Sequence, residues 1–438
     1  MISSREIIRV HFLWLQTPPC HEFIHLSPIP IFPGIRYAAE TDSPVTMSDL
    51  SVNSDPIIRW NEAGEEKSAR WRSESGTPPP KRVVIADDRM TADAAYHLAC
   101  EGTALLWRGD FQNARQLLQA MTRRANEKPG VRKKKKIAAT PAEAFHLHRL
   151  AQSQRARTLG MLLIPFNADH SIPLRRAPDV RQACTDAYGP EAKDTPTEPY
   201  IASLRGLQGL IGAYEWRKNG VEIAALGARI HPHYGVFGPI RGEYIGLVNE
   251  APLPELAETK SLAFDIGTGT GVLAAVLARR GIKRIVATDQ DPRALACARE
   301  NLTRLGLTAQ VAVVQADLFP EGRAALVVCN PPWVPARPSS PLEHAVFDPE
   351  SRMLLGFLNG LAAHLEIGGE GWLILSDLAE HLGLRTRAEL LAAIDVAGLK
   401  VLGKIDVKPH HPRVSDTSDP LHAARAAELT SLWRLASK

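Results

Sequence analysis

The chain has 438 residues, which is long for a single hydrophobic core and comfortable for two domains. Its 45% hydrophobic and 23% charged residues have the balance of an ordinary soluble globular protein. No apolar run approaches the roughly 20 residues that cross a bilayer, which excludes a membrane-spanning protein and predicts no membrane partner. The formal net charge of +4 is small for this length, so charge neither requires nor excludes a nucleic-acid partner.

The five cysteines are scattered along the chain, without a Cys-x-x-Cys pair or a histidine at ligand spacing. This pattern predicts neither a disulfide framework nor a metal site, and it favours reduced thiols in a cytoplasmic protein.

Residues 1–85 are expected to form an irregular, flexible segment, because prolines punctuate a polar, serine-rich stretch. Met47 is followed by Ser-Asp and would also serve as a start, so residues 1–46 are interpreted as a mis-called leader or a flexible tail.

Residues 86–220 are predicted to form a helical substrate-recognition domain, because their apolar residues recur at helical spacing. Thr91 is expected to cap a helix that continues to Trp107, and a second helix follows Gly109 and Asp110. Further helices are expected over residues 141–163 and about 197–218. The basic run at 132–136 between them is either a phosphate-binding patch or a solvated loop.

Residues 221–250 are interpreted as a β linker, because apolar stretches alternate there around glycines. From residue 251 to the C-terminus, apolar strands alternate with helices, a rhythm typical of a parallel sheet. The expected strands are 262–266, 284–288, 310–315, 325–329 and 370–376, with helices at 271–280, 292–305 and 351–364. The tail is expected to supply the final strands.

A glycine-rich loop follows the first of these strands and is the sharpest motif of the chain. It reads Asp265-Ile266-Gly267-Thr268-Gly269-Thr270-Gly271. Glycines here let the backbone approach a ligand at the carboxyl edge of the sheet. The dinucleotide fingerprint Gly-x-Gly-x-x-Gly fails because its last position holds Val272. The loop is therefore better suited to a nucleoside that carries an amino acid than to a pyrophosphate.

Two further strands end in acidic residues. Asp289 lies where a carboxylate can accept both hydroxyls of a ribose, the role that an acidic residue plays in dinucleotide sites. Asp317 and its neighbour Leu318 follow the next strand, and Asp317 is expected to face an adenine amine.

The tetrapeptide Asn330-Pro331-Pro332-Trp333 follows a fourth apolar strand. A conjugated amide or aromatic amine is a poor nucleophile, because its lone pair is delocalised. The side-chain carbonyl of Asn330 and the backbone carbonyl of Pro331 can hold the two N–H groups of such a nitrogen, while the prolines stiffen the geometry. Trp333 offers a flat face for a planar group.

Taken together, these motifs resemble the class I methyltransferases of the small-domain group, and most of all the HemK-like protein-glutamine methyltransferases that modify release factors. Phe347-Asp348-Pro349, Leu355-Gly356 and Asn359-Gly360-Leu361 extend the likeness, and Gly238–Glu243 is a looser echo of the family linker. The resemblance implies a Rossmann-like, mostly parallel seven-stranded sheet behind the helical domain. It also implies S-adenosylmethionine as methyl donor. Its cofactor-binding residues would be Asp265, Gly267, Thr268, Gly269, Gly271, Asp289, Asp317 and Leu318. The catalytic residues would be Asn330, Pro331, Pro332 and Trp333.

The function stays open between three alternatives, two of which differ in the methyl acceptor. A glutamine side chain of a protein, such as a release factor, comes first. An exocyclic amine of adenine or guanine in rRNA, tRNA or DNA is next, because Trp at position 333 is commoner in adenine amine methylases than in glutamine methylases. The third alternative is a non-catalytic module that binds RNA or a ribosomal partner.

Overall fold

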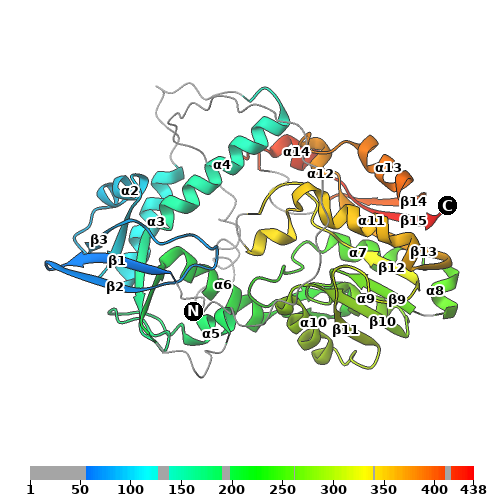
Figure 1. The fold of residues 1–438 in the computed structure, drawn as a ribbon, viewed down its shortest axis with the longest axis horizontal. Coiled ribbons are helices and arrows are strands. Elements are labelled where there is room, and N and C mark those ends of the chain that lie inside the picture. Colours follow the sequence, from blue (N-terminus) through cyan, green and yellow to red (C-terminus); the bar gives the residue numbers. More distant parts are fainter. Residues whose placement is uncertain (1–55, 127–137, 190–197, 261, 339–340, 410–415) are drawn as a thin grey trace, which may run out of the picture.

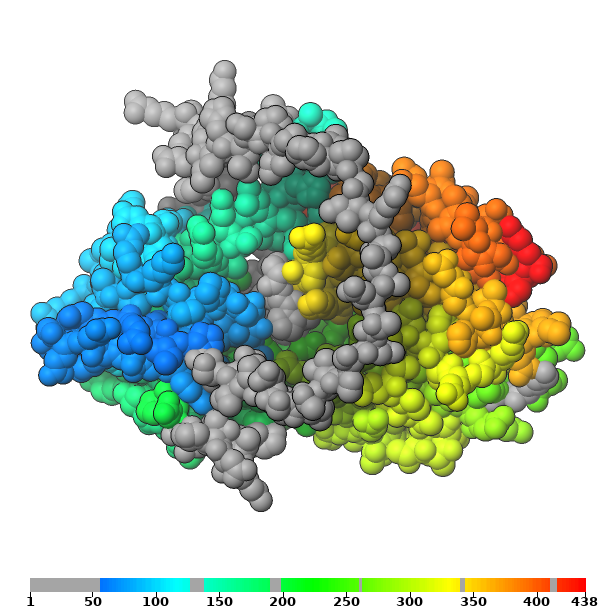
Figure 2. Space-filling model, in the orientation of Figure 1, coloured from blue at the N-terminus to red at the C-terminus, as the bar shows by residue number. Residues whose placement is uncertain are grey.

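The computed structural model describes residues 56–126, 138–189, 198–260, 262–338, 341–409 and 416–438. Each half of the chain contains one large β-sheet with helices packed beside it (Figure 1). In the space-filling view of Figure 2 the N-terminal half, blue to cyan, and the C-terminal half, yellow to red, occupy opposite ends of the molecule. Within the described residues, no helix is both long enough and apolar enough to cross a membrane.

The C-terminal half contains the predicted seven-stranded sheet. Its strand order is β11-β10-β9-β12-β13-β15-β14. The five strands from β11 to β13 are parallel, and β15 runs antiparallel to both of its neighbours. In chain order the strands are β9 (Leu262–Ile266), β10 (Arg284–Asp289), β11 (Val311–Gln315), β12 (Ala324–Cys329), β13 (Leu365–Ser376), β14 (Leu399–Val407) and β15 (Thr430–Ser437). The Rossmann-like fold expected of this half is confirmed.

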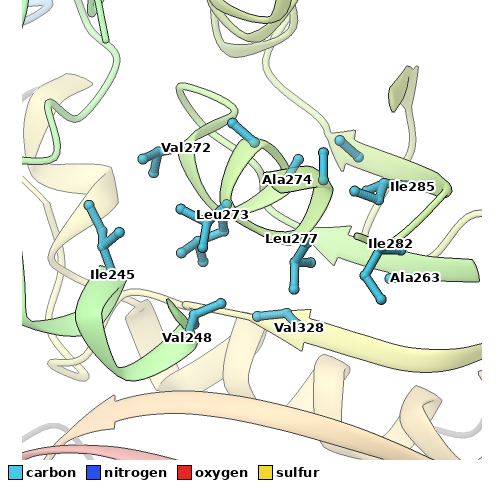
Figure 3. Close-up of a cluster of buried hydrophobic side chains, with 14 of the residues drawn as sticks. Ile245, Val248, Ala263, Val272, Leu273, Ala274, Leu277, Ile282, Ile285 and Val328 are labelled. Carbon is cyan, nitrogen blue, oxygen red and sulfur yellow. The ribbon is translucent and has the colours of Figure 1, made fainter. Parts of the chain in front are cut away.

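Helices cover both faces of this sheet. Successive side chains of a strand point to opposite faces, and in these parallel strands the side chains on both faces are mostly apolar. Ala263 of β9 packs on one face with residues of α7 and α9, while its neighbour Phe264 packs on the other face with α11 and α13. Figure 3 shows the first of these two clusters, with Ile245 and Val248 of α7 beside Leu273 and Leu277 of α9. The helices of this half are α7 (Glu243–Glu250), α8 (Glu255–Lys260), α9 (Val272–Arg279), α10 (Pro292–Arg304), α11 (Arg352–His364), α12 (Leu378–His381), α13 (Arg387–Val396) and α14 (His422–Ala427).

The N-terminal half also contains a sheet, which corrects the prediction of a helical domain. Six strands lie in the order β1-β2-β6-β5-β4-β3. They are β1 (Ile57–Glu62), β2 (Glu65–Trp71), β3 (Arg82–Ala86), β4 (Thr103–Trp107), β5 (Leu162–Phe166) and β6 (Tyr200–Ser203). The expected helices are present beside it as α2 (Ala92–Cys100), α3 (Phe111–Asn126), α4 (Pro141–Leu159) and α6 (Leu204–Asn219), together with α5 (Arg181–Tyr188). Strands β1 to β3 also replace the irregular chain expected before residue 86.

Strands β4, β5 and β6 were missed because they lie at the ends of helices that were predicted too long. Thr91 caps α2 as expected, with its side chain accepting from the amide of Ala94, but α2 ends at Cys100 and β4 begins at Thr103. Every residue of β4 and of β5 is buried, so neither strand shows the alternation that marks a half-exposed strand. A short apolar run of this kind cannot be told from a buried helix by periodicity.

The segment between the halves is only partly the predicted β linker. Strands β7 (Val221–Ile223) and β8 (Ala228–Ile230) form an antiparallel hairpin. Residues 243–250, expected to form strands and turns, are instead the helix α7. Tyr244, Ile245 and Val248 lie on one face of α7 and pack into the core beside α9, and this burial outweighs the local glycine-rich pattern.

Replacement of Leu277 by alanine tests the core in Figure 3. Leu277 on α9 is fully buried, so we expect Leu277→Ala to lower the free energy of unfolding by roughly 2–5 kcal/mol in chemical denaturation. Leu391 on α13 is 43% exposed and gives a matched control, for which the change should stay within about 0.5 kcal/mol. Equal losses in the two variants would contradict this description of the core.

Candidate active site

The register of three parallel strands brings the predicted motifs to one edge of the sheet. Ile266 of β9 pairs with Thr288 of β10 on one side and with Cys329 of β12 on the other. The next residue of each strand therefore lies in the same row at the carboxyl edge: Asp289, Gly267 and Asn330. Ligands of open α/β sheets bind at this edge.

The glycine loop is built around the carboxylate of Asp265. This side chain is 1% exposed, and its Oδ2 accepts from the hydroxyl of Thr268 at 2.7 Å and from the amide of Ala274 at 3.0 Å. Burial raises the pKa of Asp265 to about 6. Asp265 thus holds the loop against the first turn of α9, so we expect it to act on a ligand through the shape of the loop.

Glycines are required in this loop by backbone conformation. Gly267, Gly269 and Gly271 all have positive φ angles, of 71°, 54° and 80°. A Cβ at Gly271 would lie 3.3 Å from Ala298, whereas one at Gly269 would meet nothing within 4 Å. The loop therefore packs tightly where α9 begins and leaves open space above Gly269, where a ligand can approach the backbone.

Asp289 sits beside that open space and is half-buried. Its Oδ2 accepts from the amide of Gly269 at 3.0 Å, and its Oδ1 accepts from the amide of Asp291 at 3.0 Å. A carboxylate offers about four lone-pair positions, so acceptor capacity remains for two hydroxyls of a ligand. Burial raises the pKa of Asp289, and its charge also contributes to the raised pKa of Asp265. A cationic ligand at this edge would relieve the repulsion between the two carboxylates.

Asp317 and Leu318 also reach this edge. Leu318 has a positive φ of 76°, unusual for a side chain of its size, and its carbonyl accepts from the hydroxyl of Thr288 at 2.5 Å. Asp317 pairs with Arg352 at the start of α11, at 3.0 Å, but both side chains are more than 60% exposed, so this ion pair contributes little stability.

The tetrapeptide is held by its own tryptophan. The indole Nε1 of Trp333 donates to Oδ1 of Asn330 at 2.9 Å. Because Nε1 can only donate, this bond fixes which end of the Asn330 amide faces the tryptophan and leaves one lone pair of Oδ1 for another donor. Pro331 is buried and Pro332 half-buried, which keeps the intervening backbone rigid.

Sequence reasoning missed Arg241, which covers one side of Trp333. Its guanidinium carbon lies 5.0 Å from the centre of the indole, a cation–π arrangement. Ion pairs to Glu243 at 2.6 Å and to Glu428 at 3.1 Å hold the guanidinium in place. The indole also contacts three separate hydrophobic clusters, so much of its surface is already used in packing. The only signal for Arg241 in the sequence was its place in the linker echo Gly238–Glu243.

Comparisons with known proteins match the part of the chain that contains this edge. Residues 247–381 match the model of the family described as methyltransferase small domain. This segment belongs to that family. It forms the core of a class I, S-adenosylmethionine-dependent methyltransferase domain with HemK-like relatives.

Curated relatives of the methyltransferase domain carry two kinds of name. A release factor glutamine methyltransferase of Cereibacter sphaeroides is 33% identical over 181 residues, which are 38% of this chain and 62% of that protein. A putative protein N5-glutamine methyltransferase of Methanocaldococcus jannaschii is 28% identical over 36% of this chain and 80% of that protein. A ribosomal protein L11 methyltransferase of Pelotomaculum thermopropionicum is 51% identical over 69 residues, 15% of this chain and 22% of that protein. The chain thus spans less than two thirds of the length of the first of these relatives.

The basic run at 132–136 lies outside the described residues, as does residue 47. In the part of the chain that the structure describes, no group of three or more His, Cys, Asp or Glu side chains is arranged to hold a metal ion.

Replacement of Asp265 by asparagine gives a pH-dependent test of the loop. The carboxyl titrates near its ordinary 3.8 when unfolded and at about 6 when folded, so the folded state holds the proton more tightly. The stability of the native chain should therefore fall as pH rises from about 4 to 7, by roughly 2–3 kcal/mol relative to Asp265→Asn. Both loop bonds use one oxygen, which the asparagine carbonyl can replace, so the variant should still fold. Parallel stability profiles of the two proteins, measured by denaturation at each pH, would contradict the assignment.

Proposed function

We propose that this chain is an S-adenosylmethionine-dependent N-methyltransferase that acts on the side-chain amide of a protein glutamine. The proposal rests on one observation: the register places Asn330, with its amide orientation fixed by Trp333, in the same row as Gly267 and Asp289. The similarity to release factor glutamine methyltransferases supports a release factor as the first acceptor to test.

The donor half of the site is the edge formed by the glycine loop and Asp289. The open space above Gly269 and the remaining acceptor capacity of Asp289 suit a nucleoside with a ribose diol. Leu318 and Asp317 would flank its adenine. When bound, S-adenosylmethionine supplies a methyl group on a sulfonium, and the departing product is a neutral thioether.

The acceptor half acts by orientation. The remaining lone pair of Oδ1 of Asn330 and the backbone carbonyl of Pro331 would accept the two N–H groups of the glutamine amide. This grip turns the nitrogen lone pair toward the methyl carbon, and such positioning is worth up to roughly 7–11 kcal/mol. One C–N bond forms as the C–S bond breaks, and the nitrogen then loses one proton to water. A strong general base is not required, because the nitrogen becomes acidic on methylation.

Methyl transfer from donor labelled in the methyl group tests the acceptor. The native chain should label purified release factor, and acid hydrolysis of the labelled protein should release volatile methylamine, because a methylated side-chain amide is hydrolysed to glutamate and methylamine. Label that stays on an amino acid after hydrolysis would indicate an amine acceptor. Label that appears only in cell extract and disappears with RNase would move the acceptor to RNA and contradict the glutamine proposal.

Asp289→Asn tests the donor half. Loss of the charged acceptor for two hydroxyls should raise the dissociation constant for S-adenosylmethionine by about 10- to 100-fold in calorimetry. Asp291→Asn is a matched control two residues away: Asp291 caps α10 by accepting from Arg293 at 2.8 Å, and asparagine caps about as well. Its donor affinity should be unchanged. Equal effects in the two variants would contradict a donor role for Asp289.

Asn330→Ala tests the acceptor half. The rate of transfer should fall by at least about 100-fold, because the acceptor nitrogen is no longer oriented. Donor affinity should stay within about threefold of the native value, because Asn330 does not touch the glycine loop in this proposal. Transfer at the native rate would show that another residue orients the acceptor.

A further inference from the structure

One helix of the N-terminal half reaches the methyltransferase domain beside the tetrapeptide. Figure 1 shows α4 between the two halves: it begins near α12 and α14 and ends at the N-terminal sheet, where β5 follows it. Near its start, Phe145 is 4% exposed and packs with Val334, Phe347 and hydrophobic residues of the C-terminal half. The rings of Phe145 and Phe347 lie 6.4 Å apart between centroids.

Arg149, one helical turn after Phe145, holds the same region through polar contacts. Its Nη1 pairs with Oε1 of Glu343 at 3.0 Å, and its Nη2 donates to the backbone carbonyl of Arg337 at 2.8 Å. Its guanidinium carbon also lies 4.0 Å from the centre of the Phe347 ring. The side chains of Arg149 and Glu343 are each 17% exposed, so this contact is largely shielded from water.

These contacts converge on one loop directly after Trp333, of which the structure describes residues 334–338 and 341–348. We call it the acceptor loop. Its two ends are bonded to each other: the amide of Val334 donates to the carbonyl of Val346 at 3.2 Å, and the amide of Asp348 donates to the carbonyl of Val334 at 2.9 Å. Asp348 then caps α11 by accepting from the amides of Met353 and Leu354. The base of the acceptor loop is therefore fixed by the methyltransferase domain itself, whereas Arg149 holds Arg337 and Glu343 between the two ends.

We propose that Arg149 is a positioning residue for the methyl acceptor, contributed by the N-terminal half of the chain. It clamps the acceptor loop against α4, so that the loop and the helix form one wall of the acceptor site beside Asn330. This inference rests on the proposed function for the existence of an acceptor at that place. It implies that the N-terminal half takes part in acceptor selection through α4.

A competing explanation is that Arg149 only joins the two halves. A second cross-half ion pair separates the two explanations: Arg217 of α6 pairs with Glu300 of α10 at 2.9 Å, with side chains 28% and 29% exposed, and neither residue contacts the acceptor loop in any described interaction. Arg217→Ala therefore removes a comparable contact between the halves elsewhere. Arg157→Ala removes an exposed charge from α4 itself.

The first measurement is amide hydrogen exchange on the full chain. Arg149→Ala should speed exchange of the amides of Val346 and Phe347, which donate to the carbonyl of Glu343, by at least about tenfold. The amides of Val334 and Asp348, at the base of the loop, should change much less. Exchange of residues 265–271 should not change. Arg149→Lys should give most of the same effect, because an ammonium cannot reproduce the planar fork that reaches Glu343 and the Arg337 carbonyl together. Arg217→Ala and Arg157→Ala should leave the acceptor loop unchanged.

The second measurement is methyl transfer to purified release factor. Arg149→Ala should raise the KM for this acceptor by at least about tenfold, with donor affinity unchanged. Unchanged loop exchange in Arg149→Ala, or the same KM effect in Arg217→Ala, would overturn the inference. A native chain that binds no donor or transfers no methyl group would instead overturn the proposed function, while the exchange experiment would still decide whether Arg149 holds the loop.

Discussion

The parallel register of β9 between β10 and β12 is the constraint on which the whole candidate site depends. Ile266 pairs with both Thr288 and Cys329. The residues that follow these three, Gly267, Asp289 and Asn330, therefore lie in one row at the edge of the sheet. A slip of one strand by one residue would turn each of its side chains to the opposite face of the sheet, into a core packed for different side chains, and this disfavours other registers. The site is thus a consequence of how the core packs.

The two sides of this edge are held by different interactions. On the proposed donor side, the buried carboxylate of Asp265 and the half-buried one of Asp289 lie near each other at an electrostatic cost, which a cationic ligand would offset. On the acceptor side, orientation comes from stacked restraints: Trp333 fixes Asn330, Arg241 covers Trp333, and buried Glu428 holds Arg241. The indole therefore serves chiefly to orient its neighbours, and any planar acceptor has only its uncovered surface to stack on. The N-terminal half adds an outer restraint through α4.

The sequence predicted most strands of the C-terminal sheet, because a recognisable turn or motif follows them. The helices between these strands were also predicted, because clear breaks in the apolar pattern separate them from the strands. The prediction failed for the N-terminal sheet, because β4, β5 and β6 follow or precede helices directly and two of them are buried throughout. Of the site, the residues that follow strands were predictable. Arg241 and Arg149 were not, because their roles come from contacts across 92 and 194 residues of chain, to Trp333 and Glu343.

The central claim is that this sheet edge binds S-adenosylmethionine. Calorimetric titration of the native chain with S-adenosylmethionine and, separately, with NADH tests it most directly. We expect saturable binding of S-adenosylmethionine with a dissociation constant of roughly micromolar order, and no binding of NADH. Absence of binding by S-adenosylmethionine, or saturable binding of NADH, would contradict the account.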